Sequence, residues 1–136
     1  MSYYIATTLN APFGEAIERA ETALKTQGFG IISRIDIKET LKAKIGVDFH
    51  PYTILGACNP QLAYEALKLE DKVGTMLPCN VVVQALGPDQ TEIAAIDPVA
   101  SMQAIDNPEL VKAAGEVRAR LERVVRSLQA TAPQPA

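Results

Sequence analysis

The two cysteines are the residues of this sequence best suited to chemistry, and Cys58 has the more favourable setting. It precedes Asn59 and Pro60, a pair typical of a helix N-terminus in which asparagine is the cap. The positive end of a helix dipole favours a thiolate over a thiol, so Cys58 could act as a nucleophile, a redox sensor or a metal ligand. Alternatively, Cys58 packs as a small apolar residue at a crowded strand-to-helix junction.

Cys79 lies between Pro78 and Asn80 at the start of a predicted strand, so each cysteine is followed by asparagine at a strand end. If the two strands are neighbours, the thiols approach each other. The sequence does not show whether their Cα atoms reach the separation of about 4.4–6.8 Å that a disulfide requires. The spacing from Cys58 is too wide for a close metal or redox pair. Packing in the core is the alternative interpretation of Cys79.

His50 is the only histidine of the 136 residues, and Asp48 lies two residues before it. Imidazole and thiolate suit zinc, so these two residues could join Cys58 and Cys79 in a mixed-ligand site. The four residues lack the paired spacing of structural zinc sites, and we therefore assign no metal site. Asp36, Asp48 and Asp97 could supply a general base, and helix capping before Pro98 already explains Asp97. The sequence identifies no cofactor.

Arginines in the last predicted helix could meet an anion, but glutamates stand four residues before two of them. Glu116 precedes Arg120 and Glu122 precedes Arg126 at this spacing, which pairs the charges on the helix surface. The formal net charge of −3 also argues against a nucleic-acid binder, which needs a clustered positive surface. We therefore expect an ordinary solvated helix face.

Strands and helices in alternation are expected to position these residues. Apolar alternation or apolar runs predict strands at residues 3–8, 29–37, 52–58, 80–86 and 91–97. Cap and proline signals predict helices from Asn10 to Gly28, at 38–44 and 59–69, from Asp97, and over 107–128. Glycine and aspartate within residues 87–90 predict a hairpin. The order indicates helices covering one face of a sheet, in one α+β domain over residues 1–129 followed by a disordered tail over 130–136.

Length and composition limit the remaining possibilities. A chain of 136 residues that is 48% hydrophobic and 21% charged is expected to form one globular domain. No apolar run approaches the roughly 20 residues that span a bilayer, and the N-terminus lacks a signal-peptide pattern. We therefore expect a cytoplasmic protein with free thiols and no membrane partner. Val81, Val82 and Val83 predict a strand that is apolar on both faces, which favours a homodimer.

Two stretches resemble a known family. Residues 47–60, which contain the run Gly-Ala-Cys-Asn-Pro, and residues 77–83, which read Leu-Pro-Cys-Asn-Val-Val-Val, are similar to the domain of unknown function family 302. The resemblance extends from the first strand to the last helix. It implies a two-layer α+β fold, in which a curved, mostly antiparallel sheet of about five strands lies under helices as in the TATA-binding-protein-like arrangement. It implies a lysine or arginine where this chain has His50, and it implies no reaction.

We interpret the sequence as a small ligand-binding or sensing domain whose site lies at the strand-to-helix junction around Cys58. One alternative is a thiol-dependent enzyme or redox protein that uses Cys58. Another is a structural or interaction module with buried cysteines. The residues expected to bind the ligand are Cys58, Asn59, Cys79, Asn80, Asp48 and His50.

Overall fold

The computed structural model describes residues 2–131 and confirms the predicted α+β class. The strands are β1 (Tyr4–Leu9), β2 (Gly30–Asp36), β3 (Tyr52–Cys58), β4 (Cys79–Gly87) and β5 (Gln90–Ile96). The helices are α1 (Phe13–Thr26), α2 (Ile37–Ile45), α3 (Pro60–Leu69), the 3₁₀ helix η1 (Asp71–Met76), α4 (Pro98–Ser101) and α5 (Pro108–Thr131). Residues 132–136, which make up most of the predicted disordered tail, lie outside the described residues.

Local capping chemistry places most of the helix starts. The side-chain oxygens of Asn59, Asp97 and Asn107 accept hydrogen bonds from backbone amides of α3, α4 and α5, as the sequence predicts. Asn10 was expected to cap α1, and this expectation is wrong because the helix begins only at Phe13, after Pro12. Asp36 ends β2 and caps α2, because its Oδ1 accepts a hydrogen bond from the backbone amide of Glu39. This candidate base therefore has a structural role.

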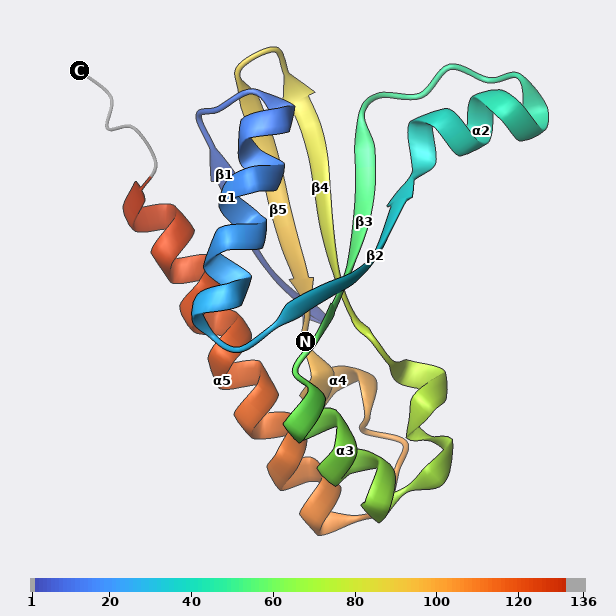
Figure 1. The fold of residues 1–136 in the computed structure, drawn as a ribbon, viewed down its shortest axis with the longest axis vertical. Coiled ribbons are helices and arrows are strands. Elements are labelled where there is room, and N and C mark those ends of the chain that lie inside the picture. The colour runs from blue at the N-terminus through green and yellow to red at the C-terminus, as the bar shows by residue number, and fades with distance from the viewer. Residues whose placement is uncertain (1, 132–136) are drawn as a thin grey trace.

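The five strands form one antiparallel sheet in the order β1-β5-β4-β3-β2 (Figure 1). The predicted hairpin joins β4 to β5. The middle of the sheet therefore pairs β4 with β3, the two strands that carry the cysteines. In this register Cys79 is paired with Ala57, the residue before Cys58.

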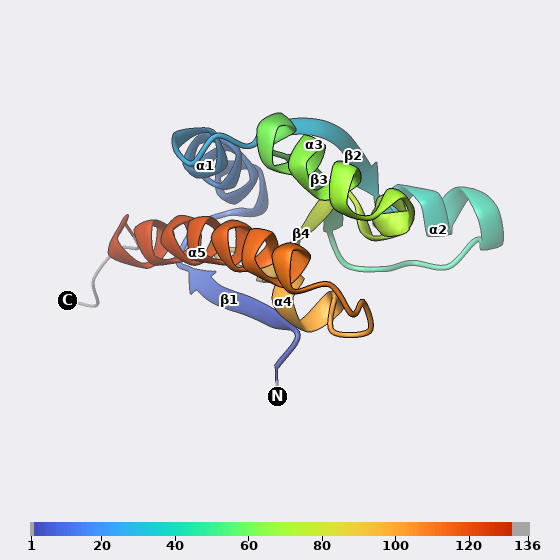
Figure 2. The same cartoon turned by 90° about the horizontal axis from the view of Figure 1, so that it is seen from below.

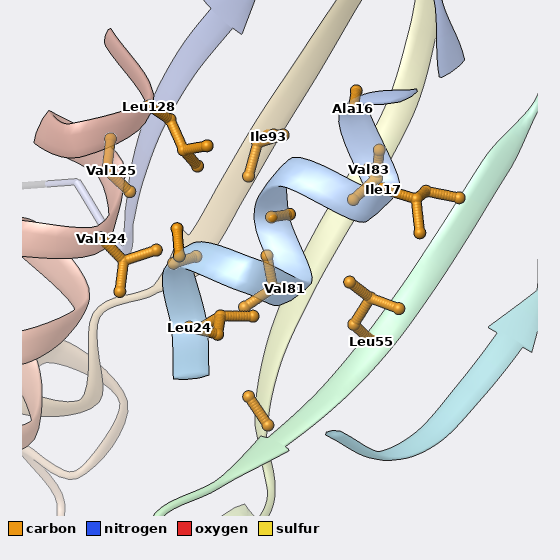
Figure 3. Close-up of a cluster of buried hydrophobic side chains, with 14 of the residues drawn as sticks. Ala16, Ile17, Leu24, Leu55, Val81, Val83, Ile93, Val124, Val125 and Leu128 are labelled. Carbon is orange, nitrogen blue, oxygen red and sulfur yellow. The ribbon is translucent and has the colours of Figure 1, made fainter. Parts of the chain in front are cut away.

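Helices α1 and α5 cover one face of this sheet. Alternate residues of the central strands point into that layer, among them Leu55, Val81 and Ile93, and none of these side chains is more than 1% exposed. Leu24 of α1 and Val124 of α5 pack in the same cluster (Figure 3). Burying a side chain of this size contributes roughly 1.5–3 kcal/mol, so this cluster is the main stabilising core.

A second hydrophobic cluster lies beyond the lower end of the sheet, where α3, η1, α4 and the start of α5 meet (Figures 1 and 2). Its buried members are Ala66, Val73, Met102, Leu110 and Ala114. None of the predicted helices covers residues 71–78, but the η1 turn within this segment buries Val73 completely. The molecule therefore has two apolar clusters that adjoin where β3 ends and β4 begins.

At the opposite end of β3, α2 extends away from the sheet and has no buried residue (Figure 2). The second face of the sheet also carries half-buried apolar side chains such as Val82 and Ala94. No helix within residues 2–131 has the length and apolar character needed to cross a membrane.

Candidate functional site

The two cysteines come together at the junction of the two clusters. In the β3–β4 ladder Ala57 is paired with Cys79, so Cys58 lies one residue beyond this pair, at the last position of β3. Cys58 is also paired with Gly30 of β2, and α3 begins two residues later at Pro60. Both cysteines are free and both line the same cavity. The structure thus brings together two thiols that are 21 positions apart in the sequence.

The cavity has a volume of about 30 Å³ and a mainly apolar wall. Side chains from both clusters form this wall, including Phe29 on the sheet side and Leu62, Met102 and Leu110 on the helical side. Among the lining residues of the described chain, Asn59 alone carries an amide or charged side chain. The residues around this small space therefore offer mainly hydrocarbon and few polar groups.

Asn59 connects the cavity to the rest of the fold. Its Oδ1 accepts a hydrogen bond of 3.1 Å from the amide of Leu62, which fixes the first turn of α3. Its Nδ2 lies against Gly28, where an added Cβ would stand 2.8 Å from Nδ2 and 3.3 Å from Nη1 of Arg120. Arg120 in turn donates to the carbonyl of Gln27 at 3.0 Å. The α1–β2 turn, the start of α3 and α5 are therefore held together beside Cys58.

Gly28 and Gly56 permit the close contacts that build this end of the sheet. Gly28 has a φ of 83°, in the left-handed region that favours glycine. At Gly56 an added Cβ would lie 2.1 Å from Oγ of Ser33 and 2.9 Å from Cγ of Pro78. Gly56 was not among the expected site residues, although a glycine inside an apolar strand signals a close backbone approach.

The two thiols have different surroundings. Cys79 is buried, and loss of hydration raises the pKa of its thiol to about 11, with a smaller contribution from the charge of Cys58. At neutral pH Cys79 is therefore protonated and a poor nucleophile. Cys58 is only half-buried and adjoins the N-terminus of α3. Of the two, Cys58 is the thiol that solvent reaches.

The other predicted ligand residues lie away from the cavity. Asn80 is exposed and faces a hollow on the second face of the sheet. His50 precedes the far end of β3, where its Nε2 is hydrogen-bonded to Oε1 of Gln84 at 2.9 Å. Asp48 forms an exposed ion pair with Lys42 at 3.0 Å. The seven residues of β3 span about 20 Å, so His50 and Asp48 do not join the thiols.

This separation has two chemical consequences. Within residues 2–131 no group of three or more histidine, cysteine, aspartate or glutamate side chains could hold a metal ion, so the four-residue zinc site considered above is not assembled. The single imidazole is also too distant to serve as a base for Cys58. The expectation of one site uniting all six residues is thus not met, since Cys58, Cys79 and Asn59 share the cavity and the other three residues do not.

Two arginines of α5 form the ion pairs that the sequence predicts, and Arg123 instead donates a hydrogen bond to Oε1 of Gln27. Arg120 contacts Glu116 at 3.1 Å and Arg126 contacts Glu122 at 2.6 Å. Arg118 additionally bonds to Asp97 at 2.9 Å, and this hydrogen bond is the main reason that the pKa of its guanidinium is raised. Asp97 therefore joins α4 to α5 besides capping α4.

Comparison with known proteins agrees with the fold. The sequence model of a domain of unknown function, DUF302, matches residues 5–128. A crystal structure of an uncharacterized conserved DUF302 protein from Bacillus stearothermophilus is 31% identical and superimposes with a TM-score of 0.85. The similarity covers 93% of this chain and 98% of that one. No curated protein matches the sequence.

Proposed function

Because this chain belongs to the DUF302 family, whose function is unknown, we propose a function from its site: a small ligand-binding or sensing domain that acts through the thiol-lined cavity. The observation that carries the proposal is that both free thiols line one cavity between two hydrophobic clusters. A cavity with few polar groups inside an apolar wall is the usual form of a small-molecule or ion site. The ligand contacts Cys58, Cys79 and Asn59.

Packing energetics support binding at this position. Protein cores are packed as densely as organic crystals, and an unfilled space costs on the order of 1 kcal/mol even at the size of a methyl group. Here α3, α4 and α5 converge on the end of the sheet and leave a hollow of about 30 Å³, partly open to solvent, with both cysteines of the chain in its wall. A ligand that occupies this space recovers the lost contacts.

Binding is better supported than nucleophilic catalysis. A catalytic cysteine needs a base or a cation that stabilises its thiolate. His50, the one imidazole, is bonded to Gln84 at the far end of β3, and burial keeps Cys79 protonated. We further propose a cytoplasmic location, where a reducing environment keeps both thiols free.

We also propose that two copies associate through the second face of the sheet. A hollow on that face is lined by Tyr4, Tyr52, Val82 and Ile96, and Tyr4 is 46% exposed. Val82→Lys should shift a dimer toward monomer in sedimentation experiments at micromolar concentration, because it places a charge in the apolar contact. Ile45→Lys, on the exposed helix α2, is the control and should leave the dimer intact. A monomeric wild-type protein would reject this part of the proposal.

Mass spectrometry tests the binding function. Protein purified gently and without a histidine tag should carry a bound mass under native conditions that is absent after unfolding. Ala63→Leu should lose this mass because the larger side chain fills the cavity, whereas Ala43→Leu on exposed α2 should retain it. The proposal fails if Ala63→Leu binds as the wild type does. It also fails if no mass is bound and Cys58 reacts with iodoacetamide only after unfolding.

A further inference from the structure

We propose that the hollow on the second face of the sheet binds a small aliphatic amine, whose ammonium group is held by the carboxylate of Glu92. The observation that carries this inference is one half-buried carboxylate beside an apolar floor, in a hollow that no cationic side chain of residues 2–131 lines. The site is separate from the thiol-lined cavity, and it goes beyond the function proposed above.

The register of neighbouring strands explains why the sheet is hollowed here. Paired residues of antiparallel strands have their side chains on the same face, and every second residue of a strand returns to that face. Val82 of β4 is paired with Ala94 of β5. Two residues away along β5 lie Glu92 on one side and Ile96, which is paired with Tyr4, on the other. The small side chains in the middle therefore lie between rows of larger ones.

The hollow has the size and the composition of a small-molecule site. Its volume of about 350 Å³ falls within the range of about 300–1,000 Å³ that such sites occupy. They are typically apolar with a few well-placed polar groups. Asn80, which the sequence analysis expected to bind a ligand, lies in this hollow and not in the thiol-lined cavity. The lining residues are Tyr3, Tyr4, Tyr52, Asn80, Val82, Gln84, Glu92, Ala94 and Ile96.

Glu92 gives the hollow its charge. It is the one charged residue among those that line the hollow in the described chain, and no salt bridge within residues 2–131 involves it. Its Oε1 accepts a hydrogen bond of 3.0 Å from Nε2 of Gln84. A carboxylate can accept about four hydrogen bonds, so Glu92 can take further donors. An ammonium group supplies both the donors and the opposite charge.

A chain of hydrogen bonds across three segments holds this carboxylate in place. Nε2 of His50 is bonded to Oε1 of Gln84 at 2.9 Å, and the other end of the same amide donates to Glu92. Both ends of the Gln84 side chain are thus engaged. A side chain that is already ordered loses less conformational entropy when a ligand binds. Gln84 and His50 are therefore positioning residues, and Glu92 is the residue that contacts the ammonium group.

The apolar floor favours an organic amine over a metal ion. Val82 and Ala94 offer hydrocarbon beside the carboxylate, and burying the alkyl chain of a ligand there is favourable. A calcium ion takes six to eight oxygen ligands, and magnesium also requires several. In the described part of the chain no cluster of three or more histidine, cysteine, aspartate or glutamate side chains is suited to a metal ion.

The proposed association of two copies over this face increases the need for a cation. It takes the carboxylate of Glu92 out of water, and a buried carboxylate without a counter-charge is costly. None of the described residues that line the hollow supplies that charge. An ammonium group bound at Glu92 does.

Calorimetric titration of the full-length protein with n-hexylamine tests the inference. The wild type should bind one hexylammonium ion per chain. The uncharged analogue 1-hexanol should bind at least about 10-fold more weakly, because hydrogen bonds between charged groups contribute more than neutral ones. Glu92→Gln should weaken hexylamine binding by a similar factor, since it removes the charge but keeps an acceptor for Gln84. Glu65→Gln on α3, whose carboxylate pairs with Lys68, is the matched control and should bind as the wild type does.

A second pair of variants tests the position of the alkyl chain. Ala94→Leu fills the floor of the hollow without changing its charge, and it should weaken hexylamine binding. Ala63→Leu fills the thiol-lined cavity instead and should leave this binding unchanged. The inference is overturned if hexylamine does not bind, if 1-hexanol binds as tightly, or if Glu92→Gln or Ala94→Leu binds as the wild type does.

Sedimentation of the same samples separates this inference from the association proposed above. Hexylamine binding by a monomeric protein supports the amine site and rejects the association. A dimer that does not bind hexylamine rejects the amine site and leaves the association standing.

Discussion

The two ends of β3 carry residues from one continuous sequence run but offer opposite environments. At the Cys58 end the strand runs into a second hydrophobic cluster, and α3, α4 and α5 line a cavity. At the Tyr52 end, His50 and Phe49 stack with ring centroids 4.2 Å apart, yet both remain exposed. Proximity in sequence therefore does not make a site here. A site forms here where elements from elsewhere in the chain pack around a residue, because this packing changes both the hydration and the neighbours of its side chain.

The largest effect on stability is expected from Cys79, which is buried, in contrast to the residues at the exposed end of β3. Its thiol pKa is about 11 in the folded protein and 9.0 in an ordinary setting. A raised pKa stabilises the folded state below pH 9, and this contribution is lost as the pH rises through 11. Cys79→Ala should remove a pH dependence of up to about 3 kcal/mol between these pH values. Urea unfolding of both proteins from pH 8 to 11 measures it.

Lysines and tyrosines titrate in the same pH range in both proteins. The free energy of unfolding of Cys79→Ala is therefore subtracted from that of the wild type at each pH. Cys58→Ala supplies the control, and its profile should retain the fall in stability above pH 9. Identical pH profiles for wild type and Cys79→Ala would show that Cys79 is hydrated in solution.

The second prediction concerns the crowded backbone beside the cavity. Gly56→Ala should cost about 2 kcal/mol, because its Cβ would overlap Oγ of Ser33 and press on Pro78. Gly87→Ala, where nothing lies within 4 Å of the added carbon, should change the free energy of unfolding far less. Adding Ser33→Ala should recover part of the loss at Gly56. Equal stability of the two glycine variants in urea would contradict the packing described.

A smaller effect is expected at the helix cap. Asn59→Ala removes the hydrogen bond from Oδ1 to the amide of Leu62 and should cost about 1 kcal/mol. Asn59→Asp keeps an acceptor at this position and should retain most of the stability in thermal unfolding. If alanine and aspartate are equally destabilising, the amide nitrogen beside Gly28 contributes more than the cap does.

The smallest effect is expected at the exposed end of β3. Asp48→Asn breaks an ion pair with Lys42 in which the two side chains are 86% and 63% exposed. Such pairs contribute little, so the free energy of unfolding should change by less than about 0.5 kcal/mol. Retention of the native mass found for the wild type should also be unchanged. Loss of that mass would place Asp48 in the site after all.

Much of the fold follows from local patterns in the sequence. The asparagine–proline pairs at residues 59–60 and 107–108 identify two helix starts, since caps depend only on a few neighbouring residues. Apolar alternation identifies the five strands for the same reason. The start of α1 was misplaced because Asn10 matches the residue type of a cap without being followed directly by helix. The buried turn in η1 was missed because its three-residue repeat is too short to show a period.

The class of the fold, the helix caps and the choice of the two cysteines follow from local sequence, because each of these depends on residue type and short spacing. Long-range packing instead determines that Cys58 and Cys79 line one cavity while His50 and Asp48 lie apart from it. That outcome depends on the antiparallel register of β3 and β4 and on the packing of α3, α4 and α5 below the sheet. Contacts between distant segments form where they bury the most apolar surface, and no local pattern specifies which partner supplies that surface.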